Sequence, residues 1–121
     1  MQDISLGAVE SRFADIIWTN APLPSSELVK LAEAALGWKK STTYTVLKRL
    51  CEKGIFENSG GSVTAKISRE SFYTLQSQQF VDNAFQGSLP AFLAAFTSGK
   101  KLSAQEVAQL RQLVQSYEEE S

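Results

Sequence analysis

The chain has 121 residues, of which 43% are hydrophobic, so it is long enough for one good core and too short for two large domains. A single cysteine and no histidine exclude disulfide frameworks, zinc clusters and imidazole catalysis, and we expect neither an enzyme nor a bound cofactor or metal. No run reaches the roughly 18 apolar residues of a membrane span and the N-terminus does not resemble a signal peptide, so we expect a cytoplasmic protein.

The net charge of −1 is unevenly distributed along the chain. Residues 1–37 carry a net charge of −3 and residues 68–121 carry −2, whereas residues 38–67 have six cations against two anions, a net charge of +4. Such a local concentration of positive charge is what a DNA-binding surface needs. A solvated basic face on an ordinary helix would give the same distribution, so charge alone does not decide.

The N-terminal third predicts two helices separated by an extended link. Apolar residues recur at helical spacing in residues 8–19, and two prolines within residues 21–24 then disfavour helix. Ser25 is placed as the N-cap of a second helix, which Gly37 should end in the left-handed conformation.

Residues 38–56 predict a helix with two different faces, and Gly54 is placed to end it. The apolar stripe consists of Thr43, Val46, Leu47 and Leu50. The opposite face carries Ser41, Thr42, Thr45, Lys48, Arg49 and Glu52. Short hydroxyl side chains near the N-terminus and cations further along suit a recognition helix over residues 41–53, with base edges and phosphates as its partners. Cys51 lies one turn beyond Leu47, and we expect it to be a small buried hydrophobe.

Beyond this helix the pattern becomes extended, since residues 55–58 and 63–67 flank the glycine turn 59–62. Three helices followed by a hairpin is the order of a winged helix-turn-helix domain, which we place at residues 1–67. A structural module with the same order of elements but without DNA binding is the alternative.

From Ser68, which is placed to cap a helix, the pattern is helical again and predicts three more helices over residues 68–121. Ser103 and Glu106 form a capping box at the start of the last one, and residues 118–120 form a solvated acidic tail. The fold class is therefore mainly α with a small β-hairpin, a winged helix-turn-helix domain followed by a three-helix C-terminal region.

The C-terminal region is rich in phenylalanine on segments that look too short to bury these rings mutually. We expect it to form a homodimer, because one recognition helix spans too few base pairs for specific binding and a two-fold dimer presents two. The alternative is that the region folds back on the N-terminal domain. The residues expected at the dimer interface are Phe80, Phe85, Phe92, Phe96, Leu110 and Val114.

The chain resembles the penicillinase-repressor family of winged-helix regulators over nearly its whole length. The matching pieces are Ile16-Ile17-Trp18, Trp38, Thr42-x-x-Thr45-x-Leu47-x-Arg49-Leu50, Lys53-Gly54-Ile55, Phe80-Val81-x-x-x-Phe85-x-Gly87 and Leu102-Ser103-x-x-Glu106-x-x-x-Leu110. The resemblance implies a dimeric repressor of palindromic operators. It also implies induction by cleavage of the repressor after a membrane sensor in the same pathway detects a β-lactam.

Position by position, the resemblance places Thr42 and Thr45 on the base-reading face and Arg49 at a phosphate. Ser41 and Tyr44 occupy neighbouring reading positions where relatives often have basic residues. Relatives that are cleaved have an Asn-Phe bond, and the matching pair is Ala95-Phe96. Copper-responsive relatives have a C-terminal cysteine cluster that this chain lacks, so direct metal sensing is not expected.

The leading hypothesis is a sequence-specific DNA-binding repressor without enzymatic activity. The expected base contacts are Ser41, Thr42, Tyr44 and Thr45, and the expected phosphate contacts are Lys39, Lys40, Lys48, Arg49 and Lys66. The alternative is a winged-helix module that binds protein and ignores specific DNA.

Overall fold

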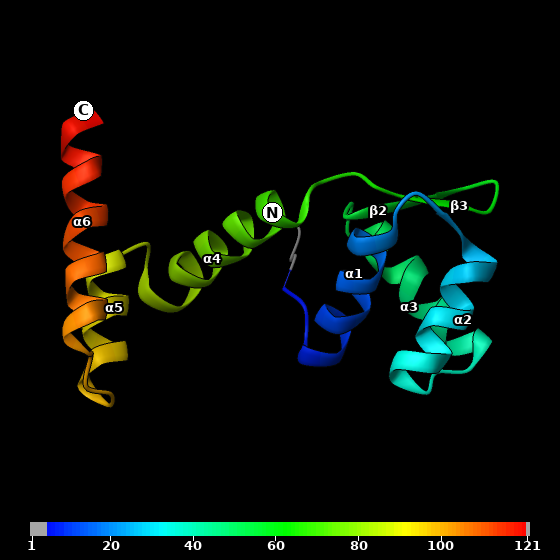
Figure 1. Cartoon of the computed structure of the whole chain (residues 1–121), viewed down its shortest axis with the longest axis horizontal. Coiled ribbons are helices and arrows are strands. Elements are labelled where there is room, and N and C mark those ends of the chain that lie inside the picture. Colours follow the sequence, from blue (N-terminus) through cyan, green and yellow to red (C-terminus); the bar gives the residue numbers. More distant parts are fainter. Residues whose placement is uncertain (1–4, 121) are drawn as a thin grey trace. The chain divides into compact units, whose positions relative to one another are not determined.

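A computed structural model describes residues 5–120, which form mainly helices together with one small sheet (Figure 1). The elements are α1 (Ala8–Asn20), β1 (Leu23–Pro24), α2 (Ser25–Leu36), α3 (Lys40–Glu52), β2 (Phe56–Ser59), β3 (Ser62–Ala65), α4 (Arg69–Phe85), α5 (Leu89–Ser98) and α6 (Ala104–Glu120). They belong to two compact units that divide between Gln79 and Phe80. The predicted fold class, a winged helix followed by a helical region, is confirmed.

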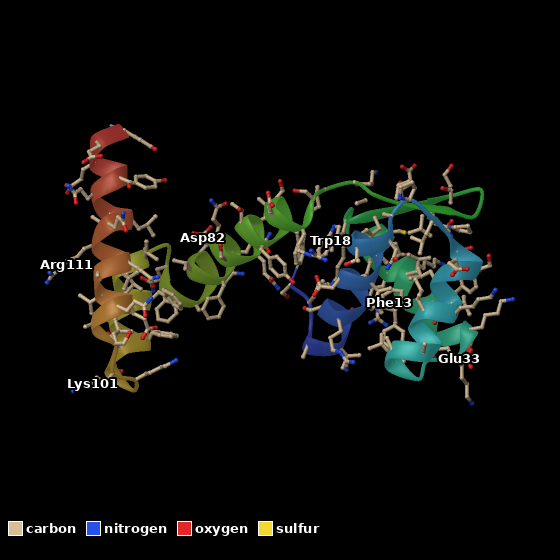
Figure 2. The ribbon with its side chains drawn as sticks, viewed as in Figure 1. Phe13, Trp18, Glu33, Asp82, Lys101 and Arg111 are labelled. Atoms are coloured by element: carbon tan, nitrogen blue, oxygen red, sulfur yellow. The ribbon has the colours of Figure 1, made fainter. Side chains whose placement is uncertain are left out.

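The core of the first unit lies among α1, α2, α3 and the hairpin. Figure 2 shows Phe13 inside this cluster, and its ring lies 4.9 Å from that of Trp38 in the turn before α3. The predicted apolar stripe of α3 is confirmed, because Thr43, Val46, Leu47 and Leu50 are all buried. The hydroxyl of Thr43 is satisfied by donating to the carbonyl of Lys39 at 3.1 Å, so a polar residue can occupy this core. Burial of this stripe fixes which face of α3 looks outward.

Two of the predicted helix ends are confirmed, and one predicted cap is wrong. Gly37 adopts a φ of +68° directly after α2, and Gly54 adopts a φ of +82° just beyond Lys53, the C-cap of α3. Glycine adopts this conformation without a Cβ clash. Ser25 does not cap α2, since it is the first residue of the helix and Pro24 stands at the N-cap without a side-chain bond. The hydroxyl of Ser25 instead contacts Tyr44.

The hairpin forms as predicted, and it is part of a three-stranded antiparallel sheet with the order β1-β3-β2. Ser59 pairs with Ser62 across a turn in which Gly60 and Gly61 both have positive φ, as a two-residue hairpin of type I′ requires. The segment predicted as a simple link supplies β1, through Leu23 opposite Val63. The amide of Ser25 donates to the carbonyl of Gly61 at 2.7 Å. The tip of the β2–β3 hairpin, which is the wing of the domain, is therefore attached to the start of α2.

The first turns of α4 are packed on α1. Ser68 caps α4 as expected, because its Oγ accepts from the amide of Ser71 at 3.1 Å. Phe72 is fully buried, with its ring 5.3 Å from that of Trp18, whose indole N–H donates to the carbonyl of Ile67. Arg69 reaches Asp15 on α1 at 3.0 Å. The beginning of α4 therefore belongs to the first compact unit, whereas the sequence assigned the whole helix to the C-terminal region.

The second unit contains the end of α4, then α5 and α6. Ser88 caps α5, with Pro90 in its first turn, and the predicted capping box of α6 is confirmed by reciprocal bonds of 3.0 Å between Ser103 and Glu106. The acidic segment 118–120 was expected to be a tail, but it continues α6 to Glu120. The phenylalanines of this unit contact one another, the closest pair being Phe85 and Phe92 at 5.5 Å.

Mutual contact does not bury these rings. Within the described part of the chain, neither α5 nor α6 contains a buried residue, and Phe80 and Phe96 keep 53% and 47% of their surface exposed. Other exposed apolar residues of these helices are Leu89, Leu110, Leu113, Val114 and Tyr117. Among residues 5–120, no helix is both long and apolar enough to cross a membrane.

Candidate nucleic-acid interface

The outward face of α3 presents hydroxyl groups and cations together. Ser41, Thr42, Thr45, Lys48 and Arg49 are all exposed, as the sequence predicted for this face. Thr45 is exposed and donates its hydroxyl proton to the carbonyl of Ser41 at 2.9 Å, which leaves its hydroxyl oxygen free to accept a hydrogen bond. Such a surface can accept hydrogen bonds from base edges and can contact a thymine methyl group.

Tyr44 is placed differently from its neighbours on α3. It is half-buried, packs against the core, and its hydroxyl lies 3.0 Å from the hydroxyl of Ser25. The sequence contained a signal for this, because Tyr44 stands three residues before Leu47 and seven before Cys51, on the edge of the buried stripe. The structure therefore joins Tyr44 to α2 and separates it from the exposed hydroxyls.

A hollow of about 440 Å³ lies between α3 and the hairpin. Lys48 from α3 and Lys66 from the end of the hairpin both line it, together with Tyr44, Cys51 and Glu57. The cations expected to contact phosphate on α3 and on the wing thus border one concave surface. Lys39 and Lys40, the other members of this set, lie exposed at the N-terminus of α3.

Arg49 has a partner that sequence reasoning missed. Its Nη1 lies 3.4 Å from Oε2 of Glu10 on α1, and both side chains are partly exposed. The other carboxylate oxygen of Glu10 accepts from the amide of Gly7 at 3.3 Å. One turn beyond Arg49, the ammonium group of Lys53 donates to the carbonyl of Ser5 at 2.9 Å. The start of the described chain therefore contacts the basic end of α3, through residues nearly 40 positions or more apart in sequence.

Cys51 is half-buried where a buried hydrophobe was expected. Burial raises the pKa of its thiol, while a hydrogen bond from the backbone of Asn58 acts in the opposite direction. Within residues 5–120, no cluster of histidine, cysteine or acidic residues could hold a metal ion.

Three helices with a hairpin after the third, and an exposed polar face on that third helix, define the class of winged helix-turn-helix proteins. The sequence profile of the family described as penicillinase repressor matches residues 6–116, nearly the whole chain. The chain belongs to this family of DNA-binding transcriptional repressors. One relative is a penicillinase repressor of Bacillus licheniformis, 24% identical over 106 residues, a match that covers 84% of this chain and 83% of that protein.

Proposed function

We propose that the protein represses transcription as a homodimer that binds a palindromic operator, with α3 of each protomer in the major groove. The observation that carries this proposal is the orientation of α3. Its apolar stripe is locked in the core, so its hydroxyls and cations share the outward face. The major groove admits a helix and presents distinct donors and acceptors for each base pair.

Within this arrangement, Ser41, Thr42 and Thr45 read base edges. Tyr44 approaches the DNA from the side of α2, because its contact with Ser25 holds the ring there. The cations that contact phosphate are Lys39, Lys40, Lys48, Arg49 and Lys66. Phosphate contacts supply most of the salt-dependent affinity, and base contacts supply sequence preference.

The exposed apolar surface of the second unit supports the dimer. α5 and α6 line a groove of about 360 Å³ formed largely by Phe92, Phe96, Leu110 and Leu113. Helices that bury none of their residues within one described chain gain little stability alone, and a second copy would remove this apolar surface from water. We assign the interface to the six residues predicted from sequence, Phe80, Phe85, Phe92, Phe96, Leu110 and Val114.

Cleavage of the Ala95–Phe96 bond, after a membrane sensor in the same pathway responds to a β-lactam, is the inactivation step we propose. The bond lies inside α5, so a protease requires local opening of this helix. The lack of buried residues in α5 makes such opening inexpensive. A chain that ends at Ala95 should sediment as a monomer and bind DNA weakly, whereas retained dimerisation would exclude this route.

Selection of bound fragments from the source genome with the purified protein tests the proposal directly. On the recovered sequence, Arg49→Ala should weaken binding and reduce the salt slope by about one, whereas Thr45→Ala should cost about 1–3 kcal/mol and change base preference. Binding is compared at about 50 and 200 mM salt. Lys101→Ala removes an exposed cation outside the first unit and serves as the control. Unchanged affinity and slope for Arg49→Ala would refute its assignment.

The second candidate is a winged-helix module that binds protein. Its support is the acidic composition on both sides of the basic segment. Analytical ultracentrifugation with and without the recovered duplex separates the two functions, since a protein-binding module would sediment identically in both samples.

A further inference from the structure

The N-terminal segment contacts the basic end of α3 at two points, which are independent of each other. Glu10 pairs with Arg49 at 3.4 Å, and the backbone of Ser5 accepts from Lys53 at 2.9 Å. Arg49 lies in the last turn of α3, the helix that we assign to the major groove, and Lys53 is the C-cap of that helix. The carboxylate of Glu10 thus contacts the guanidinium of Arg49, the group that the proposed function assigns to DNA phosphate.

Glu10 is held in this position by its own helix. One oxygen accepts from the amide of Gly7, the N-cap residue of α1, and the other contacts Arg49. The carboxylate retains 24% of its exposure and the guanidinium side chain 53%, so both groups remain accessible to solvent. The pair is therefore weak enough to open when a stronger anion arrives.

We propose that Glu10 competes with DNA phosphate for Arg49 and so limits the affinity of the protein for DNA. The proposal rests on the proposed function. A guanidinium binds carboxylate and phosphate through the same fork of N–H donors, so the two anions contend for one group. This competition lowers affinity without altering which bases are read.

The test compares the full-length protein with Glu10→Gln, on a mixed-sequence duplex and on the selected genomic fragment. Glutamine keeps an oxygen that can accept from Gly7 but has no charge, so α1 stays capped. At about 50 mM salt we expect Glu10→Gln to bind DNA about two- to fivefold more tightly than the unaltered protein, which is the range that loss of an exposed ion pair can supply. The variant should also show a steeper salt dependence of binding. Base preference should not change.

Two further variants distinguish this pair from a general effect of charge. Asp15→Asn removes a carboxylate from the same helix, one that pairs with Arg69 rather than with α3, and should leave DNA affinity unchanged. In the background Arg49→Gln, the additional change Glu10→Gln should have no effect. Thermal unfolding of each variant shows that it is folded.

Several outcomes overturn the inference. Equal or weaker binding by Glu10→Gln would mean that the carboxylate orients Arg49 instead of competing for it. Tighter binding that persists without Arg49, or that Asp15→Asn reproduces, would reflect net charge alone. Failure of the unaltered protein to bind either duplex would instead contradict the proposed function, so the two failures are distinguishable.

Discussion

The hydroxyl oxygens of Tyr44 and Ser25 lie 3.0 Å apart and join α3 to the first residue of α2. The amide of the same serine donates to the carbonyl of Gly61 in the turn of the hairpin. Ser25 therefore connects two surfaces of the proposed interface, the recognition helix and the tip of the wing. A residue expected to cap its own helix holds two other elements together.

Removing this contact should lower the free energy of unfolding. Tyr44→Phe and Ser25→Ala should each cost about 0.5–1.5 kcal/mol in the free energy of unfolding, and the double variant should cost less than the sum because they share one hydrogen bond. Urea unfolding measures these values. Strict additivity of the two changes would show that the hydroxyls do not interact.

Phe72→Ala should destabilise the first unit by about 3–5 kcal/mol, because the ring is fully buried against Trp18 and its loss leaves a cavity. Phe96→Ala removes an equally large side chain that is half exposed, and should cost the first unit little. Thermal unfolding monitored by tryptophan fluorescence compares the two, since both tryptophans lie in the first unit. Similar losses for both variants would contradict the assigned burial.

Val114→Glu should convert the proposed dimer into a monomer, because a charge placed in an apolar interface must be buried without a partner. Sedimentation equilibrium measures the change. Gln112→Glu adds the same charge to an exposed polar position of α6 and should leave the association constant nearly unaltered. Dissociation by both variants would point to overall charge, not to the apolar face.

Gly61→Ala in the hairpin turn should cost about 1–2 kcal/mol, since φ is +88° there and a Cβ is strained in that conformation. The neighbouring space is open enough, with Oγ of Ser25 3.9 Å from the position of the added Cβ, so the cost arises in the backbone. Gly99→Ala, at a φ of −103°, is the matched control and should be tolerated. Unfolding of both variants by urea checks the difference.

The thiol of Cys51 should react slowly with iodoacetamide near neutral pH, because burial raises its pKa and less thiolate is present. A group whose pKa is raised on folding contributes stability below its unfolded pKa, about 8.5 for a thiol, and this contribution is lost as pH rises through the folded value. Alkylation rates with and without urea, between about pH 7 and pH 10, measure the effect. Faster alkylation of the folded protein would contradict it.

Local patterns predicted most of the first unit. The stripe through Thr43 and Leu47, the glycines after α2 and α3, and the hairpin turn each depend on residues close in sequence. β1 could not be found in this way, because Leu23 pairs with Val63, far away in sequence. A two-residue segment that contains Pro24 and follows Pro22 has no strand pattern of its own. Its pairing depends on where the hairpin lies after folding.

The candidate site shows the same limit. Exposure of Ser41, Thr42 and Thr45 followed from helical periodicity alone. The partner of Arg49 did not, because an ion pair between α1 and α3 requires the packing of two helices to be known. Phe72 lies within residues 68–121, which the sequence assigned to the C-terminal region, and its contact with Trp18 joins it to the first unit.

The unburied surfaces of α5 and α6 have a consequence for dosage. In a dimer formed through these helices, the fraction of protein that can bind both half-sites of an operator follows mass action. The midpoint of thermal unfolding likewise rises with protein concentration. For such a dimer, the number of copies per cell would itself control repression. In a cell that stops making the protein and keeps dividing, dilution would lower the dimer concentration and end repression of the target genes without inducer or proteolytic cleavage.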